Sequence, residues 1–368
     1  MQIQISGRSD SIVDAILMTN KIHVGGPKPI AAIALGIFLL HSAVFGMTSQ
    51  IIPKSEQVVI TLKGSATDAE IQDALDALPA TGGVVVLPAG DFVIRQPIVL
   101  KRDNQKLRGS GTATVLRLAN DANCPVIIMG EPVNNPRKTV RHLRVADLFI
   151  DGNRRNQHRE NWGLQGDNSE IRNNGITVQR VSDSVVENVG CADCRSGGLV
   201  TTLGVRGLMV KGLTAFDNQF DGLACYDTKN STFSDLYLHD NPGAGISLDL
   251  AFNHNIVSNA VLVANSLGIF MRASRQNQFH NVTIRNSHHF GVYMSDTEDF
   301  TTGSQGKVVP ESECTLNAFT NLTATNCGGA AFCVDSFTCT NNVILRPSFA
   351  RNRMGNLALA SPNLVTVQ

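Results

Sequence analysis

Three side chains of reactive types recur at equal spacing, because Tyr226, Asp249 and Arg272 lie 23 residues apart. An arginine can neutralise a carboxylate, and a tyrosine beside it can transfer a proton. This combination suits removal of the proton next to the carboxylate of an acidic sugar, since that proton is released only when the carboxylate is neutralised. The alternative is a surface ion pair between Asp249 and Arg272, with Tyr226 as a wall residue.

Four further residues join this set. His289 is an alternative base, and Tyr293 is a candidate substrate-binding residue. Asp227 and Asp296 are alternative acid/base or metal-binding residues, because glycoside hydrolysis uses two carboxyl groups about 5–9 Å apart. Asp227 with Asp249 also suits Ca²⁺, the one cofactor that the sequence brings into consideration.

The candidates belong to a repeat that starts at glycines separated by 23, 24, 23, 23 and 23 residues. These glycines are Gly175, Gly198, Gly222, Gly245, Gly268 and Gly291. Apolar residues alternate with period two in "GLACY", "GISLD" and "GIFMR", which indicates strands. The period predicts an all-β fold, a single-stranded right-handed parallel β-helix with one coil per repeat of about 23 residues.

The β-helix would position the candidates. The residue after each glycine should point into the core and the next one outward, so Tyr226, Asp249 and Arg272 should form one exterior column. Two asparagine columns at the turns are predicted to be structural. The first contains Asn230, Asn253, Asn255 and Asn277, and the second Asn218, Asn241, Asn265 and Asn286.

Two other segments should border this repeat. "TDAEIQDALDAL", residues 67–78, predicts a helix that caps the open N-terminal end of the coils. The insertion at residues 154–174 contains Arg154, Arg155 and Trp162, which are predicted to bind substrate by ion pairing and stacking.

The N-terminal residues predict export. A basic lead precedes the apolar run "PIAAIALGIFLLHSAVFG" at 29–46, which is typical of a secretory signal. Residues 1–50 are therefore assigned to a signal peptide, or alternatively to a membrane anchor and leader. Residues 51–368 are assigned to the β-helix domain, with a capping segment at about 56–110.

Eight cysteines suit a secreted or periplasmic protein. Cys191 and Cys194 form a CxxC that is weak evidence for a metal site. One or two disulfides are predicted in the C-terminal group, which consists of Cys314, Cys327, Cys333 and Cys339.

"ATGGVVVLPAGDFVIRQPIVLKRDNQKLRGSG", "LFIDGN" and the glycine-led coils resemble the right-handed parallel β-helix proteins of the pectate-lyase-like superfamily. The resemblance covers about residues 56–360 and implies the fold. It also implies a polysaccharide lyase, a uronan C5-epimerase, a glycoside hydrolase or a non-enzymatic relative. The Asp-Pro-His-Asp motif of mannuronan epimerases is absent.

We therefore expect an enzyme that acts on an acidic polysaccharide by removing the C5 proton of a uronate. The alternatives are a glycoside hydrolase with paired aspartates and a non-catalytic polysaccharide-binding surface protein. Zero net charge argues against a nucleic-acid partner. A membrane is expected as a partner only if the N-terminal apolar segment is retained.

Overall fold

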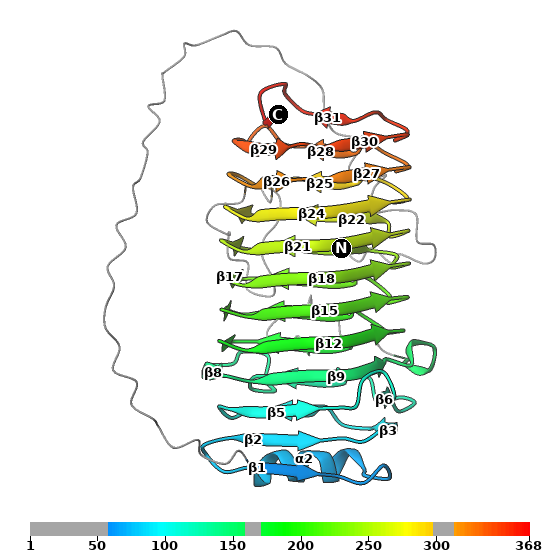
Figure 1. The fold of residues 1–368 in the computed structure, drawn as a ribbon, viewed down its shortest axis with the longest axis vertical. Coiled ribbons are helices and arrows are strands. Elements are labelled where there is room, and N and C mark those ends of the chain that lie inside the picture. Colours follow the sequence, from blue (N-terminus) through cyan, green and yellow to red (C-terminus); the bar gives the residue numbers. More distant parts are fainter. Residues whose placement is uncertain (1–57, 159–170, 297–312) are drawn as a thin grey trace, which may run out of the picture. The chain divides into compact units, whose positions relative to one another are not determined.

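The computed structural model describes residues 58–158, 171–296 and 313–368 (Figure 1). The chain divides into two compact units, Met1–Lys54 and Ser55–Gln368, and the described residues belong to the second. The proposed signal segment and Trp162 lie outside the described residues. Within those ranges, no helix has both the length and the apolar character needed to cross a membrane.

The described strands form three parallel sheets, here called A, B and C. Sheet A contains β1 (Val58–Thr61), β2 (Gly83–Val86), β3 (Gly90–Ile94), β5 (Gln105–Arg108), β6 (Thr114–Leu118), β9 (Arg144–Asp151), β12 (Val185–Ala192), β15 (Met209–Phe216), β18 (Thr232–His239), β21 (Ile256–Val263), β24 (Gln278–Arg285), β26 (Ala318–Thr320), β27 (Thr323–Thr325), β29 (Asn342–Leu345), β30 (Ser348–Ala350) and β32 (Val365–Val367).

Sheet B lies on a second side of each coil. It contains β4 (Ile98–Leu100), β7 (Ile127–Met129), β10 (Ile176–Gln179), β13 (Leu199–Thr202), β16 (Leu223–Tyr226), β19 (Ala244–Asp249), β22 (Leu267–Met271), β25 (Val292–Met294), β28 (Phe332–Val334) and β31 (Leu357–Leu359). Sheet C contains β8 (Val140–Arg141), β11 (Val181–Ser182), β14 (Val205–Arg206), β17 (Thr228–Lys229), β20 (Phe252–Asn253) and β23 (Ser274–Arg275).

Each strand pairs with the equivalent strand of the next coil. In sheet B, Leu223 pairs with Ile246, and Ile246 pairs with Ile269. Figure 1 shows the strands of sheet A stacked in chain order from β2 to β24. One coil therefore supplies one strand to each sheet, and the predicted parallel β-helix is confirmed.

The interior is apolar because alternate side chains of the strands point inward. Leu223, Ile246, Ile269 and Val292 lie at equivalent positions and have no exposed surface. Burial of such columns is the main stabilising contribution, at about 25 cal/mol per Å² of apolar surface.

Asparagine ladders support the turns, in part as predicted. The amides of Asn218 and Asn241 donate to Asn241 Oδ1 (3.1 Å) and Asn265 Oδ1 (2.9 Å), respectively. A second ladder connects Asn255, Asn277, Asn317 and Asn342 through distances of 2.9–3.3 Å. Asn286 is not part of the first ladder: it has a positive φ of 56° and bonds Asn326 instead.

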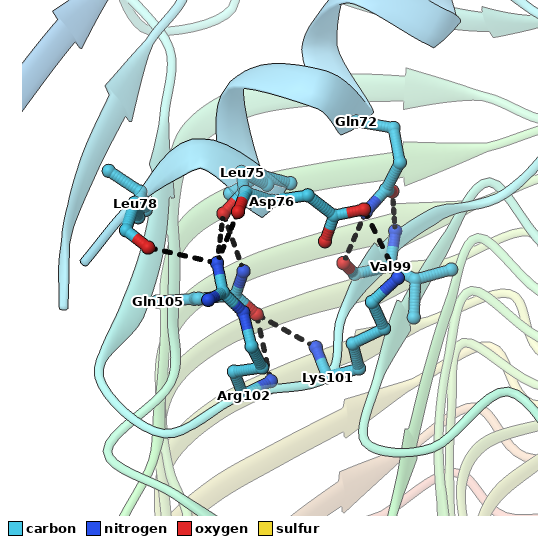
Figure 2. Close-up of polar contacts among 8 residues, drawn as sticks. All are labelled: Gln72, Leu75, Asp76, Leu78, Val99, Lys101, Arg102 and Gln105. Atoms are coloured by element: carbon cyan, nitrogen blue, oxygen red, sulfur yellow. Dashed lines mark hydrogen bonds and ion pairs between the residues drawn. The ribbon is translucent and has the colours of Figure 1, made fainter. Parts of the chain in front are cut away.

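The helix expected at residues 67–78 is present as α2 (Asp68–Ala77), with Thr67 and Glu70 forming a capping box. Its Gln72 amide bonds both backbone groups of Val99 in β4, at 2.8 and 3.2 Å (Figure 2). Arg102 donates to the last carbonyls of the helix, including Leu78 O at 3.0 Å. These bonds satisfy backbone groups that a strand edge and a helix end otherwise leave open.

All eight cysteines are free thiols, so the predicted disulfides are not formed in this structure. Cys191 and Cys194 are both fully buried, and Cys194 donates to Ala192 O at 3.6 Å. Cys333 lies outside the main core, packed against Phe290 and Tyr293. The C-terminal cysteines are therefore not one group.

A candidate active site on the outer face of sheet B

Tyr226, Asp249 and Arg272 come together on sheet B. Tyr226 pairs with Asp249 across β16 and β19, and Arg272 directly follows the residue that pairs with Leu248. Arg272 forms an ion pair and hydrogen bond with Asp249. The column is less exposed than the sequence predicts, since the Asp249 side chain is 3% exposed and that of Arg272 is 20% exposed.

Two arginines flank this column, and each lies over a phenylalanine ring. The guanidinium carbon of Arg272 is 5.0 Å from the ring centre of Phe270. That of Arg172, which comes from the end of the 154–174 insertion, is 4.7 Å from the ring centre of Phe220. A ring face stabilises a guanidinium and fixes its plane, so both cations have defined positions.

Asp221 is the acidic partner on the Arg172 side. Its Oδ1 accepts a hydrogen bond from Ala244 N at 2.7 Å. Burial raises the pKa of Asp221 to about 6; Ala244 N–H and the Arg172 charge oppose the shift, and the Asp249 charge adds to it. A carboxyl group with a pKa near neutral can act as a general base.

The charges of this site act on Tyr226. Burial raises the pKa of Tyr226 above its usual value, and the charges of Asp221 and Asp249 raise it further, whereas Arg172 and Arg272 oppose the shift. Burial also raises the pKa of Asp249, against the attraction of Arg272. Tyr226 is therefore a protonated hydrogen-bond donor, and the phenolate base expected from the sequence is not favoured.

His289 and Tyr293 lie beside this column. His289 is half-buried in the turn before β25, and its backbone N–H donates to Ser266 O at 2.9 Å. The Tyr293 ring stacks with Phe270 and Phe290, and its hydroxyl donates to Asp335 Oδ2 at 2.6 Å. Tyr293 is only 6% exposed, so its ring is a packed wall residue.

The aspartates considered for hydrolysis have separate partners. Asp227 pairs with Arg206, Oδ1 to Nη2 at 3.0 Å. Asp296 accepts hydrogen bonds from Ser336 and from Thr338 Oγ1, the latter at 3.1 Å. Asp249 is bound to Arg272, so the three carboxylates are directed to three different groups.

The arginines chosen from the insertion lie near sheet A. Arg154 is in a short 3-10 helix, η1 (Arg154–Asn156), and its Nε is 3.2 Å from Asp193 Oδ1. Arg155 is exposed beside it. The part of this insertion that reaches the Tyr226 column is Arg172.

Arg172 and Asp221 were the residues missing from the sequence prediction. Asp221 immediately precedes a repeat glycine, a position otherwise occupied by Asn174, Gly197, Ala244, Leu267 and Phe290. Its charge at that position was the available signal. Arg172 carried a weaker one, since it lies three residues before Gly175 in the segment that enters β10.

A family model described as "Periplasmic copper-binding protein (NosD)" matches residues 104–329, more than half of the chain. The chain belongs to the NosD family. No curated protein matches its sequence.

The NosD description names copper, so the described residues can be examined for a copper site. They contain no group of three or more His, Cys, Asp or Glu side chains that could hold a metal ion. Copper in proteins is held mainly by Cys, Met and His, and all eight cysteines are among the described residues. The described residues therefore do not fit such a copper centre.

Solved structures share the fold of this NosD-family chain. A polygalacturonase from Erwinia carotovora has a TM-score of 0.59 at 12% identity, covering 87% of this chain and 99% of that chain. A family 28 exopolygalacturonase from Yersinia enterocolitica has a TM-score of 0.56 at 11% identity, covering 85% and 78%. A fragment of bacteriophage phi29 gene product 12 has a TM-score of 0.55 at 12% identity, covering 83% and 63%.

These likenesses establish the fold. The right-handed parallel β-helix and the resemblance to the pectate-lyase-like superfamily are confirmed. At such low identity, the activity of each neighbour remains a property of that neighbour.

Proposed function

We propose that this chain is an exported enzyme that acts on an acidic polysaccharide by transferring the C5 proton of a uronate. The observation that carries the proposal is the arrangement around Tyr226, where two arginines and a carboxyl group with a pKa of about 6 act on a protonated tyrosine. The fold shared with two polygalacturonases supports a polysaccharide as the substrate.

Each residue has a role in the proposed reaction. Arg172 and Arg272 bind the uronate carboxylate and stabilise the negative charge that develops when the C5 proton leaves. Asp221 accepts that proton. In β-elimination, Tyr226 gives its proton to the departing C4 oxygen; in epimerisation, it gives a proton to C5 from the opposite face. Asp249 holds Arg272 in position.

A groove on the same sheet supports an anionic substrate. It lies beside β4 and β7 and is lined by Lys101, Arg137 and Lys138 together with Glu131. Lys101 follows β4, and Tyr226 belongs to β16, three strands from β7 in sheet B. Parallel strands lie about 4.8 Å apart, so a chain of several sugars can span the two places.

The proposal is favoured over hydrolysis by paired aspartates. A retaining or inverting hydrolase needs two carboxyl groups that face one glycosidic bond. Asp227, Asp249 and Asp296 instead have different partners: Arg206, Arg272 and the hydroxyls of Ser336 and Thr338.

Polysaccharide binding without catalysis is the second candidate, because the family description names a binding protein. A panel of uronans should separate the candidates, read by ultraviolet absorbance, reducing ends and deuterium uptake from heavy water. The proposal expects an unsaturated product or deuterium at C5. Reducing ends without unsaturation would indicate hydrolysis, and saturable binding without any product would indicate the second candidate.

Export of the chain is also proposed. The basic and apolar pattern of residues 1–50 and the word "periplasmic" in the family description support it. Mass spectrometry of the mature protein should find an N-terminus close to Gly46. A full-length chain in the membrane fraction would favour the anchor, and a full-length chain in the cytoplasm would contradict export.

A further inference from the structure

Cys314 and Cys339 occupy equivalent positions on neighbouring coils. Ala318 of β26 pairs with Val343 of β29, so the residues four positions earlier, Cys314 and Cys339, face each other across the same two coils. Their separation of 25 residues matches the spacing of the Asn317–Asn342 step in the ladder. Both cysteines have no exposed surface.

The backbone around the two thiols is held in place. Cys314 N donates to Cys339 Sγ at 3.3 Å. The Asn342 amide donates to the carbonyls of both cysteines, at 3.0 Å to Cys314 O and 3.3 Å to Cys339 O. Neighbouring parallel strands lie about 4.8 Å apart, within the range of about 4.4–6.8 Å that a disulfide spans between Cα atoms.

We propose that Cys314 and Cys339 form an intercoil disulfide when the protein meets a disulfide oxidant, and that this bond fastens the C-terminal coils to the stack. The C-terminal strands are short, three residues each in β28, β30 and β31, and the side chains of β30 and β31 are largely exposed. Solenoid coils are stabilised by their neighbours alone, so a covalent bond has most effect near such an end.

The reaction is a thiol–disulfide exchange. The Cys339 thiolate attacks one sulfur of the oxidant, forms a mixed disulfide and releases one thiolate. The Cys314 thiolate then attacks the Cys339 sulfur, closes the protein disulfide and releases the second thiolate. The two protein protons pass to the two released thiolates. The hydrogen bond from Cys314 lowers the pKa of the Cys339 thiol, which favours Cys339 as the attacking group.

Other cysteines lack such a neighbour. Cys225 pairs with Thr201 and Leu248 on the adjacent coils. Cys327 receives its backbone bond from Asn352 and makes a weak contact with Thr325 O. Cys333 pairs with Tyr293 and Ala358. The Cys314–Cys339 step is the place where the register itself aligns two thiols.

Thiol counting tests the proposal. The reduced protein is treated with oxidised glutathione, then denatured, alkylated and digested for mass spectrometry. The expected result is a fall from eight alkylated cysteines to six, with one peptide pair linked through Cys314 and Cys339. Eight alkylated cysteines, glutathione adducts alone or a link between other cysteines would overturn it.

Two variants control the experiment without depending on the fold alone. Cys339→Ser should keep all seven of its remaining thiols, whereas Cys225→Ser should still lose two. Oxidation should raise the thermal midpoint of the wild-type chain by about 5 °C and leave that of Cys339→Ser unchanged. An equal rise in both proteins would contradict the intercoil bond.

Discussion

Sheets A and B differ in how their outer faces are used. Along β18 and β21 in sheet A, buried side chains alternate with exposed or half-exposed ones, while all six residues of β19 in sheet B are buried. Sheet A displays polar side chains to water, including the exposed Asn259–Asp235 and Asn281–Asn259 contacts. Sheet B keeps charged side chains in a covered layer.

This difference matters because water weakens charge interactions. The Arg144–Glu187 pair of sheet A has side chains 44% and 28% exposed, whereas Asp249 of sheet B is 3% exposed. An exposed pair contributes about 0–1 kcal/mol, while breaking a buried pair costs about 3–5 kcal/mol. A repeat needs no buried charges for its scaffold, so their presence on one face indicates a site.

The largest expected effect is that of Arg272→Ala compared with Arg144→Ala. Removal of Arg272 leaves Asp249 charged and buried, and the free energy of unfolding should fall by about 3–5 kcal/mol at pH 7. Arg144→Ala should change it by less than about 1 kcal/mol. Urea unfolding followed by circular dichroism measures both. Similar small losses would mean that the two sheets do not differ in this way.

The second comparison is Tyr226→Phe with Tyr237→Phe. Tyr226 lies in the site, whereas Tyr237 is 44% exposed on sheet A. If Tyr226 transfers a proton, its loss should lower turnover of a uronan by about 100-fold, with little change in the thermal midpoint. Tyr237→Phe should leave turnover unchanged. An unchanged rate for Tyr226→Phe would remove it from the mechanism.

The third comparison concerns polar groups inside and outside the coils. Asn241→Ala removes donors to Ala215 O (3.1 Å) and Asn265 Oδ1 (2.9 Å) within the buried ladder. Unsatisfied buried groups cost about 1–3 kcal/mol. Asn259→Gly removes an exposed side chain at a φ of 53°, which glycine adopts freely, so it should be nearly neutral. Urea midpoints of the two variants check this.

The sequence predicted the fold because the period of 23 residues and the inward alternation reflect the same stacking. It also placed Tyr226, Asp249 and Arg272 in one column, since residues at equal spacing fall in register. The prediction of an open exterior column was wrong in its burial, because alternation distinguishes inward from outward but does not show what covers the outward side.

Arg172 and Asp221 show why the rest of the site was not predicted. Arg172 lies in an irregular segment, so no register relates it to the column. Asp221 precedes the strand, and its proximity to Asp249 depends on the path of the turn between coils. The asparagine columns illustrate the same limit: a turn one residue longer moves Asn286 out of the ladder and into the left-handed position.

The smallest expected effect is a change in pH dependence caused by Asp221→Asn. The pKa of Asp221 is about 6 in the folded chain against a model value of 3.8, so the folded state binds this proton more tightly than the unfolded state. The contribution of Asp221 to stability is therefore largest below about pH 4 and is lost as the pH rises to about 6.

Asp221→Asn lacks this titration and can still accept the Ala244 hydrogen bond. Its thermal midpoint should therefore rise relative to the wild type between about pH 4 and 6 and keep a constant difference above that range. Asp235→Asn on sheet A is the control for the same substitution at an exposed position. A constant difference across the whole range would mean that Asp221 is not the group with the raised pKa. The wild-type rate should meanwhile fall as the pH drops through about 6, because a protonated Asp221 cannot accept the C5 proton.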